Sequence, residues 1–233
     1  MKKIFILLIY ASIIYSSTIY VPNDFPTIQL GIDAASDGDT VMVSSGTYVE
    51  NINWPTTSGI RLIGVHMDST IIDGGGVDKV IDNSDDTSHP KEISNLTIQN
   101  GYTTGKGGGI SLKMTGEILL KNIRVKNNQA NFGGGIHIEG EGSLSFVQTV
   151  VHIENAIISN NNATSSDGGI DLDGDFISSI VKNSTIVNNS AVNGGGGLDA
   201  GSPGNYAIIV NSIFWNNQPA NTDGIVIPYY SNV

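Results

Sequence analysis

Side chains that can hold or transfer protons recur just after the glycine clusters of this chain. His137 and Glu139 follow one glycine run, Asp171 and Asp173 follow the next, and Asp199 follows a third. On a β-strand, the second and fourth residues point to the same face. If these segments are neighbouring strands about 5 Å apart, their carboxylates raise one another's pKa and form a candidate acid/base site.

The same face admits two further interpretations. Four of the acids are candidate oxygen ligands for Ca²⁺, namely Asp171, Asp173, Asp175 and Asp199. The third interpretation is a solvated surface, because the exterior positions of a soluble strand stack have to be polar. A groove walled by loops around these residues would favour the acid/base site, which has the paired carboxyl groups that glycosidases use. A flat, open face would favour a surface without catalysis.

Several other chemistries lack their residues. The chain has no cysteine, which excludes disulfides and thiol-ligated zinc or iron–sulfur sites. Its glycine runs do not match the phosphate-binding, dinucleotide-binding or nucleophile-elbow motifs. With a net charge of −11 and only 11 Lys and Arg, the chain is a poor ligand for nucleic acid. No cofactor is required by any motif, and Ca²⁺ is the one cofactor that the acids suggest.

Five six-residue segments that begin and end with asparagine align without gaps. They start at Asn95, Asn122, Asn155, Asn183 and Asn211, with intervals of 27, 33, 28 and 28 residues. A glycine cluster follows each of the first four segments. Self-similarity at a spacing of about 20–50 residues is typical of solenoids. Amphipathic helices and a leucine ladder are missing between the glycines, so helical and leucine-rich repeats are disfavoured.

About 27 residues accommodate three short strands and three turns. Connections between parallel strands are right-handed in about 98% of cases. The sequence therefore predicts an all-β fold, a single-stranded right-handed parallel β-helix (solenoid). Stacking would align equivalent residues, which predicts an apolar core column of Ile98, Val125, Ile158, Ile186 and Phe214. It also predicts a hydrogen-bonded asparagine ladder of Asn100, Asn127, Asn160, Asn188 and Asn216.

The N-terminal segment has the order of a secretory signal peptide. Two lysines precede an apolar run over residues 4–15, and small residues follow. The run is shorter than the roughly 20 residues of a membrane span. We therefore expect a signal peptide over residues 1–18, a β-helix domain over 19–233 with no membrane span in the mature chain, and an extracellular or outer-surface location.

The two ends of a solenoid expose unpaired strands and core residues unless another segment covers them. Asp24, Pro26 and Thr27 are typical of a helix start, and Ile28, Ile32 and Ala35 have helical spacing, which predicts a short N-terminal capping helix. At the other end, a fifth repeat opens at Asn211 but few residues follow. That arrangement fits either a small closing loop or a chain truncated at its C-terminus.

Two stretches of the sequence resemble known families. The segment VPNDFPTIQLGIDAASDGDTVMVSSGTYVENI resembles the opening of pectin-lyase-like right-handed parallel β-helix proteins. The Gly-Gly-Gly-Ile and Ile-x-x-Asn-Asn repeats resemble those of polymorphic outer membrane proteins and related bacterial surface adhesins. The resemblance implies the fold and an association with carbohydrate. It does not imply one activity, because the superfamily contains lyases, hydrolases, esterases and non-enzymatic adhesins.

The preferred hypothesis is a secreted or cell-surface scaffold for recognition or adhesion, with a polysaccharide or another cell surface as its partner. The alternative is a polysaccharide lyase or glycoside hydrolase for acidic polysaccharide, with His137, Glu139, Asp171, Asp173 and Asp199 as candidate catalytic residues. Against it, neither arginine lies on these strands, and the paired motifs of polygalacturonases are missing. A third hypothesis is a spacer module of a longer surface protein. The sequence does not fix the oligomeric state.

Overall fold

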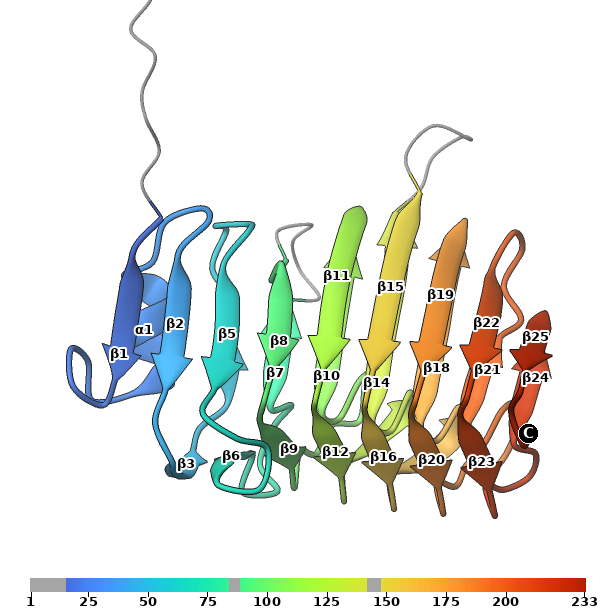
Figure 1. Cartoon of the computed structure of the whole chain (residues 1–233). Helices are drawn as coiled ribbons and strands as arrows, with labels where there is room; N and C mark the ends of the chain where they lie inside the picture. Colours follow the sequence, from blue (N-terminus) through green and yellow to red (C-terminus); the bar gives the residue numbers. More distant parts are fainter. Residues whose placement is uncertain (1–15, 84–88, 142–147) are drawn as a thin grey trace, which may run out of the picture.

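The structure is a computed structural model that describes residues 16–83, 89–141 and 148–233. The predicted signal peptide falls mostly on residues outside this range, and strand β1 already begins at Thr18. The regular secondary structure of the described chain is almost entirely β-strand, arranged as three parallel sheets that run side by side along its length (Figure 1). We name them sheets A, B and C in the order in which the chain visits them.

Each sheet takes one strand from each successive coil. Sheet A contains β1 (Thr18–Val21), β2 (Thr40–Val43), β5 (Arg61–Gly64), β8 (Glu92–Ser94), β11 (Gly116–Lys121), β15 (Thr149–Glu154), β19 (Ile177–Lys182), β22 (Tyr206–Val210) and β25 (Val226–Tyr229). Sheet B contains β3 (Gly46–Val49), β6 (Thr70–Asp73), β9 (Thr97–Gln99), β12 (Arg124–Lys126), β16 (Ile157–Ser159), β20 (Thr185–Val187) and β23 (Ile213–Trp215). Sheet C contains β4 (Ile52–Asn53), β7 (Ile81–Asn83), β10 (Ile110–Met114), β14 (Ile136–Glu141), β18 (Ile170–Asp175), β21 (Leu198–Ala200) and β24 (Thr222–Gly224). A short pair, β13 (Gln129–Phe132) and β17 (Asn162–Ser166), lies between sheets B and C in the chain.

The chain winds through the sheets in the order A, B, C and then returns to A one coil further on. In Figure 1 the strands of sheet A point downward at the front while the coils advance from left to right, so the winding is right-handed. This confirms the predicted fold class, a right-handed parallel β-helix with a short N-terminal helix.

The register of sheet B confirms the predicted core column. Ile98 pairs with Val125, Val125 with Ile158, Ile158 with Ile186 and Ile186 with Phe214. All five side chains are fully buried. Because inward-facing aliphatic residues repeat in every coil, the core is continuous from one coil to the next, as expected of a solenoid.

The helix α1 (Ile28–Asp33) covers the N-terminal end of the stack. The Thr27 side chain accepts a hydrogen bond from the Leu30 backbone N–H at 3.2 Å, so Thr27, one of the three predicted helix-start residues, is the N-cap. The Glu50 carboxylate accepts two more helix N–H groups, those of Ile28 and Gln29, at 3.0 Å each. Ile28 and Ile32 are buried beneath the helix, so the helix closes the core where sheet A begins.

In each coil two neighbouring asparagines have different roles, the first in a turn and the second in a buried ladder. The predicted ladder residues Asn100, Asn127, Asn160, Asn188 and Asn216 all have left-handed backbones, with φ between 53° and 57°. Asparagine tolerates this conformation better than most residues, so these five make the turn that follows each strand of sheet B. One amide–amide bond is found within this column, from Asn216 to Asn188 at 2.8 Å.

The continuous ladder lies one residue further along the chain. The Asn128 side chain donates to Asn161 at 3.0 Å, Asn161 donates to Asn189 at 2.9 Å, and Asn189 donates to Asn217 at 3.0 Å. These four side chains are buried, unlike the exposed turn residue Asn160. An asparagine ladder is thus present, and its uninterrupted part is the column that follows the predicted one.

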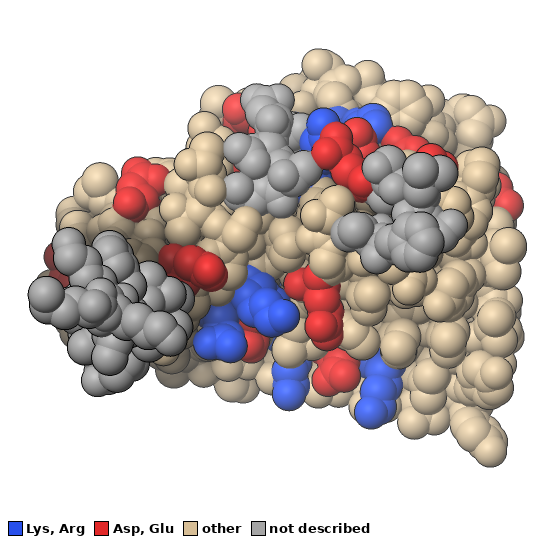
Figure 2. All heavy atoms as spheres, turned by 90° about the horizontal axis from the view of Figure 1, so that it is seen from above, with Lys and Arg blue, Asp and Glu red and all other residues tan. Residues whose placement is uncertain are grey.

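Figure 2 views the molecule from above, with the C-terminal coils at the right. On this face Lys and Arg lie beside Asp and Glu in small mixed groups, and no continuous basic stripe crosses it. Ion pairs join adjacent coils in sheet A, for example Arg61 with Glu92 at 3.9 Å and His152 with Glu117 at 3.2 Å. In the part of the chain that the structure describes, no helix has the length and apolar character of a membrane span.

Candidate functional site

The strands of sheet C bring the predicted polar residues together. Ser111 pairs with His137, His137 with Asp171, and Asp171 with Asp199, each from the next coil. In the same sheet Lys113 pairs with Glu139 and Glu139 with Asp173. The register that the glycine alignment predicts is therefore the register of the structure.

This column is much less open to solvent than an ordinary outer face. Ser111, His137 and Asp171 are buried, because the glycine turns at the entrance to each strand fold over them. A Cβ at Gly133 would stand 2.9 Å from the His137 Cβ and 3.0 Å from the Asp171 Cβ. A side chain at Gly133 would crowd both residues, so glycine lets this turn pass close over the polar column.

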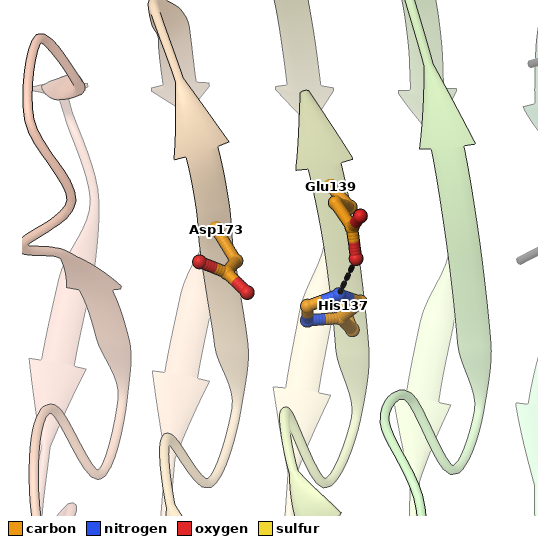
Figure 3. A group of neighbouring side chains, drawn as sticks. All are labelled: His137, Glu139 and Asp173. Carbon is orange, nitrogen blue, oxygen red and sulfur yellow. Dashed lines mark ion pairs between the residues drawn. The ribbon is translucent and has the colours of Figure 1, made fainter. Parts of the chain in front are cut away.

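His137 and Asp171 form a buried pair. The His137 Nδ1 and Asp171 Oδ2 atoms are 2.7 Å apart. Burial alone would lower the pKa of His137, but the hydrogen bond to Asp171 and the nearby Glu139 carboxylate outweigh it and raise that pKa. The Nε2 atom faces Glu139 at 3.8 Å, beyond hydrogen-bond distance, and has no hydrogen-bond partner among the described residues (Figure 3).

Lys106 links two of the predicted acids. Its Nζ donates to Glu139 Oε2 at 3.0 Å and to Asp173 Oδ2 at 2.7 Å. The neighbouring His137, together with the Lys106 ammonium, lowers the pKa of Glu139 to about 2. For Asp173, burial would raise the pKa, but hydrogen bonds from Lys106 and the Gly174 N–H hold it below its usual range. Both carboxyls are therefore ionised partners of one lysine.

Asp167 occupies a position that is glycine in the neighbouring coils. Its φ is +68°, and the corresponding turns contain Gly107, Gly133 and Gly194 with φ between 58° and 71°. The backbone confirms the alignment, because Gly134 N–H donates to the Asp167 carbonyl across adjacent coils at 3.0 Å. An aspartate in this left-handed turn places a carboxyl group over the column where the other coils have none.

The Asp167 carboxyl is the most perturbed acid of the group. Burial, together with the charges of Asp171 and Asp199, raises the pKa of Asp167 to about 7. Burial and the charges of Asp171 and Asp223 also raise the pKa of Asp199, against hydrogen bonds from backbone N–H groups. Asp167 therefore exchanges its proton near neutral pH, close to two further carboxyl groups.

These acids open onto a hollow of about 290 Å³ on sheet C. Its walls combine charged, hydroxyl and aromatic side chains with one glycine: Lys106, Phe132, Ser166, Asp167, Asp171, Asp173, Asp199, Gly201 and Ser202. Perturbed carboxyl groups that converge on a concave site are a candidate active site. Of the predicted catalytic residues, Asp171, Asp173 and Asp199 line the hollow, while His137 and Glu139 support it from behind through Asp171 and Lys106.

The predicted Ca²⁺ ligands are not all on this site. Asp171, Asp173 and Asp199 line the hollow, whereas Asp175 is exposed and outside it. A different group, His137, Glu139 and Asp173, has ligand atoms within 4.8 Å of one another (Figure 3). The Lys106 ammonium already donates to two members of that group, so it stands where a cation would bind. Calcium binding stays a prediction.

Replacing Lys106 by methionine is expected to turn this group into a divalent-metal site. The change frees two carboxylates beside an imidazole, a donor set that suits Zn²⁺ or Mn²⁺. Isothermal titration should show at least about tenfold tighter Zn²⁺ binding than in the wild type, a gain of about 1.4 kcal/mol. Lys113→Met, which removes a lysine one strand away, is the control; equal affinities in both variants would contradict the assignment.

Two charged residues that line the hollow, Lys106 and Asp167, were not among the predicted site residues. Lys106 directly precedes a glycine cluster, and nothing in its spacing marks it as the partner of an acid 67 residues away. Asp167 did leave a signal. The third glycine cluster has two glycines, and the repeat alignment puts Asp167 where the first glycine of the triplet stands elsewhere.

The comparisons with known proteins do not assign the chain to a family. No family model matches the chain, and no curated protein matches it. Among solved structures, a crystal structure of a pectin methylesterase mutant in complex with a hexasaccharide is similar, with a TM-score of 0.44 and 12% identity over 92% of this chain and 80% of that chain. That similarity concerns the course of the chain alone. The right-handed parallel β-helix fold follows from the three sheets themselves.

Proposed function

We propose that the hollow on sheet C is the active site of a glycoside hydrolase. The observation that carries the proposal is Asp167, an acid in a turn position that is otherwise glycine, beside two further carboxyl groups. Non-glycine residues with left-handed backbones cost free energy and often mark functional sites. Here the unfavourable position supplies a carboxyl group whose pKa, raised to about 7, lets it donate a proton near neutral pH.

The roles follow from the environments of the carboxyl groups. Glycosidases need one carboxylic acid that protonates the leaving oxygen and one carboxylate that activates water or attacks the sugar. Asp167, with its pKa raised to about 7, is suited to be the acid. Asp199 lies on the adjoining strand, is half-buried and faces the same hollow, so it takes the role of base. Asp171, held by His137, adds negative charge beside the developing cation on the sugar ring.

The same arrangement disfavours a lyase. Elimination from a uronate requires a free base and a cation that neutralises the uronate carboxyl group. The lysine that lines the hollow is already bonded to Glu139 and Asp173. Hydrolysis needs neither a metal ion nor an uncommitted lysine, which makes it the better match for the residues present.

The test is reducing-end release from acidic, neutral and amine-bearing polysaccharides, each with Ca²⁺ and with chelator. We expect cleavage of at least one class, unaffected by chelator. Asp199→Asn should lower kcat by about 10²–10⁴-fold. Asp33→Asn, an exposed acid on α1, should leave kcat unchanged. If the wild type cleaves nothing, or if Asp199→Asn keeps full activity, the hydrolase assignment is wrong.

A second candidate function is recognition without cleavage, which one observation favours. Trp215 on β23 is 64% exposed. It borders a second hollow of about 350 Å³ with amide side chains, among them Asn216, Gln218 and Asn221. An exposed indole beside amides is suited to stack on and hydrogen-bond a sugar. Under either function the partner is a polysaccharide, and we propose a secreted or cell-surface location.

A further inference from the structure

We infer that the hollow on sheet C selects a glycan that carries free amino groups, rather than the acidic polysaccharide that the fold alone would suggest. The inference rests on the proposed function, since it names the substrate class of the same site. It is argued from the charges that line the hollow, their existing partners, the histidine behind them and the aromatic wall.

The charges of the hollow are strongly unequal. Four aspartates line it, of which Asp167 is partly protonated near neutral pH, and Lys106 is the only basic residue among its described lining residues. The Lys106 ammonium is committed to Glu139 and Asp173, at 3.0 and 2.7 Å. Asp199 accepts a backbone N–H at 2.7 Å, and it has no basic side chain within ion-pair distance among the described residues.

A second basic side chain of this group, that of His137, is also paired with acids. His137, which is 2% exposed, bonds Asp171 through Nδ1, and its Nε2 faces the Glu139 carboxylate without a hydrogen-bond partner (Figure 3). Its charge is therefore shared between two acids behind the wall of the hollow. The Nε2 atom lacks a hydrogen-bond partner among the described residues and points into this acidic group, at the Glu139 carboxylate.

These charges decide which sugar the hollow accepts. A uronate would bring a carboxylate next to Asp171 and Asp199 with no uncommitted cation to receive it, and like charges in contact oppose binding. The ammonium of an amino sugar would meet the opposite situation, because it neutralises acids that repel one another. Phe132, which is 39% exposed at the rim, offers an aromatic face for the sugar ring or the ammonium itself.

The experiment compares three hexasaccharides on the full chain by isothermal titration at low and high salt: a β-1,4-linked glucosamine, its N-acetylated form, and a galacturonate. We expect the glucosamine hexamer to bind at least about tenfold more tightly than the N-acetylated one, and the galacturonate not to bind. Salt should weaken binding of the glucosamine hexamer, because the ammonium–carboxylate pairs are screened. CaCl₂ at equal ionic strength tests whether a bare cation competes as well as the amino sugar.

Variants separate a specific site from general attraction to an acidic protein. Asp199→Asn should weaken binding of the glucosamine hexamer at least fivefold, whereas Asp33→Asn should leave it unchanged. Equal losses in both variants, competition by Ca²⁺ at equimolar concentration, or tighter binding of the galacturonate would overturn the inference. Amine-selective binding without cleavage would support the inference and sink the hydrolase proposal. Cleavage of galacturonate would do the reverse.

Discussion

Replacing Asn161 by alanine is expected to lower the free energy of unfolding by about 3–5 kcal/mol, because it leaves several buried polar groups without partners. The Asn161 Oδ1 accepts the backbone and side-chain N–H groups of Asn128, at 3.1 and 3.0 Å. Its Nδ2 donates to the Val125 carbonyl at 3.0 Å and to Asn189 Oδ1 at 2.9 Å. Urea denaturation followed by circular dichroism measures the loss.

The adjacent asparagine gives a matched control. Asn160 is exposed and has a left-handed backbone with φ of 55°. Glycine adopts this conformation freely, so Asn160→Gly should change stability by less than about 0.5 kcal/mol, while Asn160→Ala should cost about 1 kcal/mol. If Asn161→Ala were no more destabilising than Asn160→Gly, the buried ladder would not be what joins these coils.

The one-residue offset of the ladder shows what a repeat alignment can and cannot settle. The period and the paired asparagines identify the columns, because a strand stack has to align equivalent residues. They do not say which asparagine of each pair turns inward. That choice depends on the left-handed φ of the first, which directs its own amide to the surface and the next amide into the core. Both residue types are identical, so composition carries no signal.

The strand columns were predictable for a physical reason. In sheet C, Ile110, Ile136, Ile170 and Leu198 pair as the glycine alignment predicts, because a shift of one residue would turn the aliphatic side chains out of the core. The polar residues between them then follow. Their burial was not predictable, since it comes from the path of the turns across the face of the sheet.

The contact between Lys106 and Asp173 could not be predicted from the sequence either. The Lys106 ammonium meets Asp173 two coils further along the solenoid, so the contact depends on how a loop from one coil leans across the next. Repeats predict which residues share a column, but they do not predict where an unaligned loop residue points. Asp167 was within reach, because it departs from glycine at an aligned position.

Replacing Asp167 by asparagine is expected to lower kcat/KM for glycan hydrolysis by about 10²–10⁴-fold, since the amide keeps the size of the side chain but cannot donate the acid proton. Wild-type activity should fall as the pH rises through about 7, where Asp167 loses its proton. The variant's residual activity should lack that limb of the profile. Unchanged activity, or a limb that persists in the variant, would remove Asp167 from the mechanism.

The pH dependence of the free energy of unfolding tests the raised pKa of Asp167 independently of activity. Folding raises the pKa of Asp167 from 3.8 to about 7, so its protonated form is favoured in the folded state. That contribution is fully present below pH 3.8 and is lost as the pH rises through about 7. Asp167→Asn should therefore be more stable than the wild type at pH 8, by about 1 kcal/mol, with the difference shrinking toward pH 4.

Asp167→Gly should gain more at every pH, because glycine also removes the unfavourable left-handed backbone. A variant that is more stable and inactive would show that this acid is held in its turn for chemistry; stability that falls equally at pH 4 and pH 8 would show that it is held there for structure.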